Sequence, residues 1–356
     1  MERVKIDLGK NSYDILIGKN LLKDLKTLLD GNLEQYFIIT DKNVDALYGD
    51  YLNMLDDYEK IIIEPGEQSK SIDVMTDVLK QMLEKGATRR SGVVSFGGGV
   101  VGDLAGFCSA IYMRGIPFVQ IPTTLLAQVD SSVGGKTAIN LLHYKNNVGA
   151  FHQPAKVIID TVFLETLPHR ELLSGIGEIV KYGIIYDYDF FKYVVENIEQ
   201  IKERNSDVMI YIIKRCCEIK AEIVSQDEKE EGLRKILNFG HTIGHTLEGM
   251  SSFSKYAHGE AVIIGMYYET IMAKRLGIVN DKYAERILGF LSGLGVDLNI
   301  DSYPVSGLVD WMLKDKKNVG GKISFILPVE EGKVKELLLE KNEVLKHMSF
   351  WDGQHR

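Results

Sequence analysis

The pattern of apolar and polar positions changes near residue 160 of this 356-residue chain. Before that point, apolar runs of strand length lie at residues 36–40, 60–64, 92–96, 117–121 and 156–160, and residues 1–8 alternate like a further strand. Continuously apolar runs are typical of parallel strands buried on both faces. A helix is predicted between Ser71, a suitable N-cap, and Gly86, a suitable stop. Strands alternating with helices predict an open parallel sheet.

After residue 160, helical periodicity predominates. It predicts helices over residues 209–225, 233–250, 259–276 and 283–294, and a small hairpin over 322–328 and 332–338. We therefore expect an α/β domain in residues 1–160 and a mainly α-helical domain in residues 161–356. Because no long Gly-, Ser- or Pro-rich linker separates the halves, we expect a rigid interface with a cleft.

Composition narrows the class of protein. Lys and Arg number 42 against 50 Asp and Glu, a net charge of −8, which argues against a general nucleic-acid or anionic-membrane surface. Cys108, Cys216 and Cys217 form no C-x-x-C pair, as expected in a reducing compartment without a thiolate zinc site. No apolar run approaches the roughly 20 residues of a membrane span, and the N-terminus does not resemble a signal peptide. A cytoplasmic protein is expected.

Polar or glycine-rich turns follow four of the predicted strands, at residues 41–43, 65–70, 97–103 and 122–124. Ligands bind at the carboxyl ends of strands in such sheets, so this edge suits a nucleotide. Gly97, Gly99 and Gly102 fit G-x-G-x-x-G at a strand-to-helix turn, where backbone N–H groups can approach a pyrophosphate. The motif is not on the first strand, and no acidic residue ends a later strand about 20 residues on. A plain tight turn is therefore the alternative interpretation.

Residues 130–137 resemble a P-loop but lack its first glycine, because Asp130 stands there. The segment nevertheless places Lys136 beside a glycine pair, with Lys145 soon after. Two lysines on a glycine-rich stretch of an acidic protein suggest anion capture, although a solvated loop explains them equally well.

The helical half contains a candidate metal site. His241 and His245 are spaced i, i+4 on one helical face, and His258 follows between Ala257 and Gly259. A catalytic zinc typically has three protein ligands and one open position, and Glu178 is our candidate for a His₂Glu set. A purely structural histidine pair is the alternative. No H-E-x-x-H motif is present, which disfavours a metalloprotease.

Several basic residues could complete a focused cationic pocket for a phosphorylated, carboxylated small molecule. They are Arg114, Lys136, Lys145, Lys181, Lys220, Arg234 and the pair Lys316 and Lys317. Each one alone could equally lie on a solvated face.

These motifs together resemble the 3-dehydroquinate synthase family, in order and over nearly the whole chain. The resemblance rests on residues 96–103 (FGGGVVGD), 113–115 (MRG), 120–137 (QIPTTLLAQVDSSVGGKT), 145–147 (KNN), 178–182 (EIVKY), 237–245 (LNFGHTIGH) and 258–260 (HGE). The stretch 120–137 is the most specific of them.

The resemblance implies a Rossmann-like N-terminal domain that binds NAD⁺ and a helical C-terminal domain that holds Zn²⁺ or Co²⁺. It also implies an active site between the domains and a homodimer. The implied reaction converts 3-deoxy-D-arabino-heptulosonate 7-phosphate to 3-dehydroquinate and phosphate, the second step of the shikimate pathway. The implied reaction proceeds by transient oxidation with NAD⁺, β-elimination of phosphate, re-reduction and intramolecular aldol closure. Because the NAD⁺ is regenerated in each cycle, such an enzyme is classed as a lyase.

Carried over position by position, the resemblance assigns the metal to Glu178, His241 and His258 and leaves His245 free of it. The residues implied for NAD⁺ are Asp41, Asn43, Glu67, Gln68, Ser69, Lys70, Gly98, Gly99, Val100, Gly102, Asp103, Thr123, Thr124, Lys136, Lys145, Phe163, Leu164, Glu165 and Thr166. Those implied for substrate and catalysis are Arg114, Asp130, Lys136, Asn146, Lys181, Lys220, Glu230, Arg234, Asn238, His245 and Lys316, with Lys317 as the alternative to Lys316. Glu230 and His245 fall where the family's proposed proton acceptors lie.

Three rival functions remain in view. A metal- and NAD-dependent polyol dehydrogenase shares this two-domain plan but has little use for so many phosphate-directed cations. A sister sugar-phosphate cyclase would act on another sugar phosphate, whereas Lys220, Arg234 and Asn238 favour a carboxylated substrate. A non-catalytic binding protein would have no need of intact metal and lysine positions.

Overall fold

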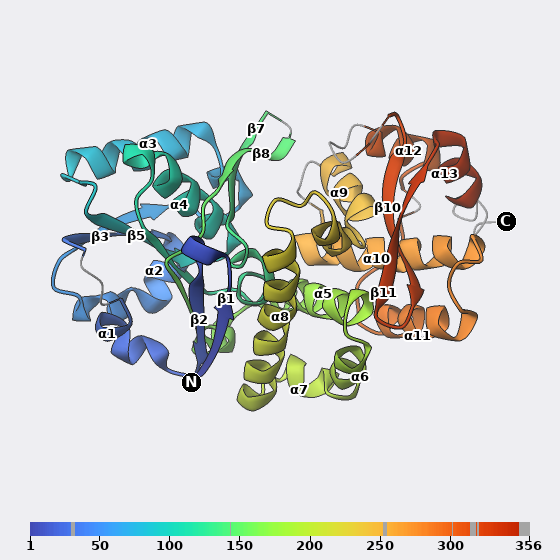
Figure 1. Cartoon of the computed structure of the whole chain (residues 1–356), viewed down its shortest axis with the longest axis horizontal. Coiled ribbons are helices and arrows are strands. Elements are labelled where there is room, and N and C mark those ends of the chain that lie inside the picture. Colours follow the sequence, from blue (N-terminus) through green and yellow to red (C-terminus); the bar gives the residue numbers. More distant parts are fainter. Residues whose placement is uncertain are drawn as a thin grey trace. The chain divides into compact units, whose positions relative to one another are not determined.

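The computed structural model describes residues 1–29, 33–142, 144–251, 255–300, 302–313, 318 and 320–348. The chain forms two compact units (Figure 1). The first contains Met1–Pro168 and Glu199–Lys229, and the second contains His169–Ile198 and Glu230–Arg356. Among the described residues, no helix is both long and apolar enough to cross a membrane.

Within the described part of the first unit, seven strands form one sheet in the order β1-β2-β9-β6-β5-β3-β4. The strands are β1 (Glu2–Ile6), β2 (Tyr13–Gly18), β3 (Gln35–Asp41), β4 (Tyr58–Ile63), β5 (Ser91–Gly97), β6 (Phe118–Pro122) and β9 (Lys156–Asp160). Only β1 and β2 pair antiparallel; every other neighbouring pair is parallel. The predicted parallel sheet is confirmed, and all the strands predicted for it are present.

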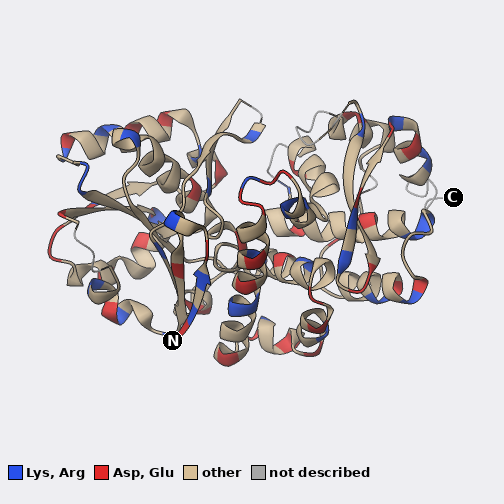
Figure 2. Ribbon diagram, in the orientation of Figure 1, with Lys and Arg blue, Asp and Glu red and all other residues tan. Residues whose placement is uncertain are grey.

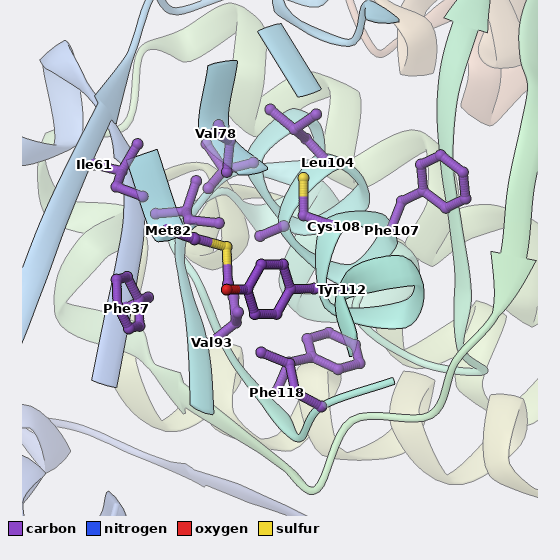
Figure 3. Close-up of a cluster of buried hydrophobic side chains, with 14 of the residues drawn as sticks. Phe37, Ile61, Val78, Met82, Val93, Leu104, Phe107, Cys108, Tyr112 and Phe118 are labelled. Carbon is purple, nitrogen blue, oxygen red and sulfur yellow. The ribbon is translucent and has the colours of Figure 1, made fainter. Parts of the chain in front are cut away.

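Side chains along β3 alternate between the two faces of the sheet, as the period of a strand requires. Phe37 and Ile39 belong to a cluster with α3 (Ile72–Glu84) and α4 (Gly99–Ile111), shown in Figure 3. Ile38 belongs to the cluster on the opposite face, with Val44 of α2 (Lys42–Tyr48) and with α1 (Leu25–Leu29). Burial of each such side chain contributes about 1.5–3 kcal/mol. Helices therefore cover both faces of the sheet.

The chain order reverses between β3 and β5, which are hydrogen-bonded neighbours. The helices that follow them, α2 and α4, pack on opposite faces. Such a switch point leaves a crevice at the carboxyl ends of the two strands, where ligands of open α/β sheets bind. This fold thus places Asp41 and Gly97 at the edge that the turns predicted for a nucleotide.

The expected division at residue 160 differs from the observed units mainly in one helix. Helix α8 (Ser206–Gln226) begins after its N-cap Asn205, whose side chain accepts from the Asp207 and Val208 amides. It packs against β1, β2 and the π-helical turn η6 (Ala127–Ser131), and so belongs to the first unit. Helical periodicity identifies such a helix but does not tell which sheet or bundle it covers.

The second unit is built around α10 (His258–Arg275), which contacts α5 (His169–Ile185), α9 (His241–Met250), α11 (Asp281–Ser292) and the hairpin strand β10 (Ile323–Glu330). The remaining elements are α6 (Tyr188–Glu196), α12 (Val305–Met312), β11 (Lys333–Leu339) and α13 (Lys341–Met348). The short helix α7 (Ile198–Lys202) leads back toward α8. The predicted hairpin is confirmed.

The helix predicted over residues 233–250 is wrong as one continuous element. It is a 3₁₀ helix, η8 (Leu233–Asn238), followed by α9, with Gly240 between them in the left-handed conformation at φ 80°. A residue with positive φ cannot continue a right-handed helix, and glycine adopts it at little cost. The break allows α9 to begin at His241.

Candidate metal centre and nucleotide site

Three helices of the second unit bring Glu178, His241 and His258 together. The Nε2 atoms of His241 and His258 each lie 3.7 Å from Oε1 of Glu178. The candidate ligand atoms of the three residues all lie within 4.8 Å of one another. Two imidazole nitrogens and one carboxylate oxygen form the donor set that zinc and similar divalent ions prefer.

The buried carboxylate of Glu178 fits a cation at this position. Glu178 has no exposed surface, and among the described residues neither of its oxygens accepts a hydrogen bond, although Lys181 forms an ion pair with it. A buried carboxylate without hydrogen bonds is costly unless a positive charge compensates it. His241 lies with Nδ1 3.1 Å from the carbonyl of Phe239, a contact that leaves Nε2 for a metal.

The start of α9 is fixed by another buried acid. Glu269 of α10 accepts hydrogen bonds from the amides of Gly240 (2.7 Å) and Ile243 (3.3 Å), which are unpaired donors at a helix N-terminus. This cap, together with the turn at Gly240, sets where the imidazole of His241 emerges.

The start of α10, which carries His258, is fixed from α5. The hydroxyl of Ser174 accepts from the Gly259 amide at 2.9 Å, and a Cβ on Gly259 would lie 2.1 Å from the Ser174 carbonyl. Only glycine permits this approach. Glu260 accepts from the Ala257 amide and pairs with Arg170, which completes the helix start.

His245 lies one turn after His241, as the i, i+4 spacing predicts; their ring centroids are 5.1 Å apart. His245, Glu248 and His258 form a second group of potential ligand atoms within 4.8 Å. Sequence analysis missed Glu248. Its spacing of i+7 from His241 and i+3 from His245, on one helical face, was the signal available.

Other predicted substrate residues gather in the second unit. Lys181 and Arg234 are almost completely buried, at about 1% exposed. Asn238 donates from Nδ2 to Oε1 of Glu230 at 2.7 Å, and Glu230 itself has a left-handed backbone at φ 63°. The structure therefore pairs two of the residues that the resemblance assigned to catalysis.

In the first unit, Asp41 ends β3 and caps α2. Its Oδ1 accepts from the amides of Asn43 (2.9 Å) and Val44 (3.1 Å). The turn after β5 opens α4 at Gly99, whose N-cap Gly98 provides no side chain to occupy the helix N-terminus. These amide groups at a switch point can accommodate a pyrophosphate, as the glycine motif predicted.

Lys70 is a buried lysine beside this turn, and it contacts polar side chains from two other segments. It is 4% exposed, and its Nζ lies 2.6 Å from Oδ2 of Asp103 and also donates to Asn146. Burial raises the pKa of the Asp103 carboxyl above its ordinary value, and the charge of Lys70 opposes that rise. Asn140 donates a hydrogen bond from its side-chain amide to Oε1 of Glu67 at 2.8 Å. Gln68 and Ser69 complete the short helix η4 (Glu67–Ser69).

Lys136 and Lys145 lie on a two-stranded antiparallel hairpin, β7 (Lys136–Leu141) and β8 (Tyr144–Phe151), rather than on the glycine-rich loop that the sequence suggested. Nearby in the chain, Asp130 of η6 accepts a hydrogen bond from Lys220 of α8 at 2.7 Å. Periodicity missed the hairpin because its strands are mixed in polarity.

Two predicted nucleotide residues have buried side chains that pack in the core. Phe163 and Leu164 are 1% exposed, and Phe163 meets Tyr48 edge-on at 4.8 Å. These two residues offer a ligand only their backbone. Thr166 contacts the Tyr48 hydroxyl, and Glu165 pairs with Lys19 at the surface.

The remaining predicted positions are as follows. Val100 and Gly102 lie in the first turn of α4, Thr123 donates its amide to the Gly97 carbonyl at 3.0 Å, and the Thr124 hydroxyl accepts from the Ala127 amide at 3.2 Å. Arg114 is exposed, with a left-handed backbone at φ 67°. Lys316 and Lys317 lie outside the described residues.

The fold is that of the sugar-phosphate cyclases. It matches a 2-deoxy-scyllo-inosose synthase complexed with carbaglucose-6-phosphate, NAD⁺ and Co²⁺ at TM-score 0.89 and 24% identity, over 98% of this chain and 99% of that one. It also matches 2-epi-5-epi-valiolone synthase from Streptomyces hygroscopicus, with NAD⁺ and Zn²⁺ bound, at TM-score 0.88 and 25% identity, over 96% and 97% of the two chains. An iron-containing alcohol dehydrogenase from Thermotoga maritima is more distant, at TM-score 0.67 and 15% identity over 96% and 98%.

Sequence comparison narrows this class. Models of the N-terminal and C-terminal parts of 3-dehydroquinate synthase match residues 60–174 and 175–318. The 3-dehydroquinate synthase of Alkaliphilus metalliredigens is 54% identical over 347 residues, 97% of either chain. That of a Thermoanaerobacter species is 46% identical over 353 residues, 97% of this chain and 99% of the relative. The chain belongs to the 3-dehydroquinate synthase family, as the resemblance indicated.

Proposed function

We propose that this chain converts 3-deoxy-D-arabino-heptulosonate 7-phosphate to 3-dehydroquinate and phosphate, with NAD⁺ regenerated in each turnover and a divalent cation, Zn²⁺ or Co²⁺, as a resident cofactor. The observation that carries the proposal is the convergence of Glu178, His241 and His258 on one point of the second unit. The relatives that are about half identical over nearly the full chain support the same activity.

The reaction needs no net oxidant. When bound, the cation polarises neighbouring hydroxyl groups, and the nicotinamide ring accepts a hydride and later returns it. In the substrate, the C–O bond to phosphate and the C6–H bond break, the ring opens, and one new C–C bond closes the carbocycle. Because the ketone that acidifies C6 is made and unmade in the same cycle, the products are 3-dehydroquinate and phosphate alone.

In the second unit, buried cations would bind and orient the charged substrate. Lys181 and Arg234 are held at low exposure, where a charge-assisted hydrogen bond to phosphate or carboxylate is strong. Asn238 positions the carboxylate of Glu230, which with His245 would accept and return protons during ring opening and closure. We assign Lys316 to substrate binding, with Lys317 as the alternative.

In the first unit, the switch-point edge would hold NAD⁺. The backbone around Gly98 to Asp103 would accommodate the pyrophosphate, and Asp41, the segment from Glu67 to Lys70 and Thr123 would flank it. The other NAD⁺ positions named from the resemblance complete this assignment. Lys136, Lys220, Asp130, Asn146 and Arg114 would serve the substrate.

The proposal is tested by measuring how many phosphates are released for each NAD⁺ supplied. Purified protein is incubated with the heptulosonate phosphate and an amount of NAD⁺ far below that of substrate, and phosphate and NADH are measured together. We expect many phosphates released per NAD⁺ and no accumulating NADH. Activity should disappear with a chelator, return on addition of Zn²⁺ and be absent in His258→Ala. NADH formed in step with substrate consumption would instead indicate a dehydrogenase.

We further propose that the enzyme acts in the cytoplasm as a homodimer. The family resemblance supports both, and the absence of a C-x-x-C pair among three buried cysteines accords with a reducing compartment. Sedimentation analysis at micromolar concentration should give twice the 40.0 kDa mass of one chain. A purely monomeric species would contradict the dimer without affecting the assigned reaction.

A further inference from the structure

Glu248 of α9 is a buried acid that touches a candidate metal ligand without belonging to the triad. It is 1% exposed, and its Oε2 lies 3.4 Å from Nδ1 of His258. The opposite nitrogen of the same ring, Nε2, lies 3.7 Å from Oε1 of Glu178. His258 therefore stands between two buried carboxylates, one at each ring nitrogen.

This geometry defines a preferred state of the imidazole. A carboxylate is only an acceptor when ionised, so its favourable partner is a ring N–H at Nδ1. A proton at Nδ1 leaves the lone pair of the neutral ring on Nε2, the atom that faces Glu178 and His241. Outer carboxylates of this kind orient a metal-binding histidine and increase its basicity.

We propose that Glu248 is a positioning residue of the metal centre, which fixes the orientation and tautomer of His258 and thereby raises the affinity for the divalent cation. The inference rests on the proposed function, because it takes Glu178, His241 and His258 as the metal ligands. Glu248 acts through His258 and does not touch the cation.

Direct ligation by Glu248 is the competing arrangement, because Glu248, His245 and His258 also lie within ligand distance of one another. It would require His258 to present Nδ1 to the metal. The observed ring presents Nε2 to the deeply buried Glu178, and Nε2 of His241 lies at the same distance of 3.7 Å from the same oxygen of Glu178. The two imidazoles therefore converge on Glu178, and this geometry favours a cation on the Glu178 side.

Asp160, at the end of β9, supplies a matched control in the first unit. It is also a fully buried acid, but its two oxygens accept the backbone amides of Asn20 (2.8 Å), Leu22 (3.1 Å) and Val162 (3.0 Å). Removing the charge of Asp160 should lower the free energy of unfolding, whereas removing that of Glu248 should lower metal affinity.

The experiment measures Zn²⁺ affinity of the metal-free, full-length protein by competition with a chromophoric chelator. The proteins are the wild type, Glu248→Ala, Glu248→Gln, Asp160→Asn and Glu178→Gln, each checked for folding by circular dichroism and thermal unfolding. We expect Glu248→Ala to bind Zn²⁺ about 10- to 100-fold more weakly. Glu248→Gln keeps an acceptor for Nδ1–H and should recover part of the loss, and Asp160→Asn should bind within about threefold of the wild type.

Visible absorption of the Co²⁺-loaded proteins separates positioning from ligation. Glu178→Gln should lose the ligand-field bands of the wild type, and Glu248→Gln should retain them with a shift. If Glu248→Gln loses the bands while Glu178→Gln keeps them, Glu248 is a ligand and the positioning role is wrong. If the wild type binds Zn²⁺ tightly and folded Glu248→Ala binds it equally tightly, this inference fails and the proposed function stands. Failure of the wild type to bind Zn²⁺ would overturn both.

Discussion

At the residue scale, burial decides which side chains can do chemistry. Glu178, Lys181 and Arg234 are each less than 2% exposed, although charged residues rarely lie so deep without a compensating partner. Glu178 and Lys181 partly compensate each other through their ion pair, and the proposed metal and anionic substrate would be further partners. The three cysteines are also buried, but they have no catalytic assignment.

Lys136 provides a direct residue-scale prediction. If it binds the substrate phosphate, Lys136→Ala removes a charge-assisted hydrogen bond worth about 1.5–3 kcal/mol, and kcat/KM should fall by roughly 10- to 200-fold. Steady-state phosphate release measures it. Lys80→Ala, which removes an exposed lysine paired with Glu84, should leave kcat/KM unchanged. Equal activity of both variants would remove Lys136 from the site.

The buried thiols predict a dependence of stability on alkaline pH. Burial raises the pKa of Cys108 and Cys217 from 9.0 to about 12. The folded state therefore keeps protons that the unfolded state loses, so this contribution is complete below pH 9 and is lost as the pH rises toward 12. Urea unfolding should give a free energy that falls over this range, and Cys108→Ala with Cys217→Ala should flatten the fall. A slope unaffected by both substitutions would be inconsistent with the shifted pKa values.

At the element scale, the sequence predicted the parallel sheet and most helices because their periods are long and clear. It could not predict the break at Gly240, since residues 233–250 keep helical spacing and the break depends on Glu269, far along the chain. Likewise, the spacing of His241 and His245 indicated a metal site, but only the packing of α5 against α10 shows why Glu178 joins it. The local pattern of apolar residues therefore predicts individual helices and strands, whereas long-range packing determines which of them contact one another.

Close approach of α9 and α10 gives an element-scale prediction. A Cβ on Gly265 would lie 1.8 Å from the Gly240 carbonyl, so Gly265→Ala must separate the two helices. We expect a loss of about 3 kcal/mol or more in the free energy of unfolding, together with weaker Zn²⁺ binding. Gly289→Ala, on α11 with open space around the added Cβ, should instead stabilise the protein by about 0.5–1 kcal/mol. Chemical denaturation of both variants measures these changes in the free energy of unfolding. If Gly265→Ala were as stable as the wild type, the close approach of Gly265 to the Gly240 carbonyl would be contradicted.

At the scale of the whole molecule, the two units supply different chemistry. The first has the strand-end turns and glycine-rich helix start proposed for the nucleotide, and the second has the three residues proposed as metal ligands. Acidic and basic residues are interspersed along the elements of both units (Figure 2), consistent with a modest net charge of −8. An iron-containing alcohol dehydrogenase shares this fold at 15% identity, so the fold alone does not settle the reaction.

What distinguishes the proposed reaction is that the same hydride leaves and returns. Substrate carrying deuterium at C5 tests this directly, with the position of the label in 3-dehydroquinate read by mass spectrometry and NMR. We predict that the deuterium remains on the carbon that was C5, with none in the NAD⁺ pool beyond the amount of enzyme. Deuterium recovered in free NADH would contradict the account. So would a single turnover that yields product without transient formation of bound NADH.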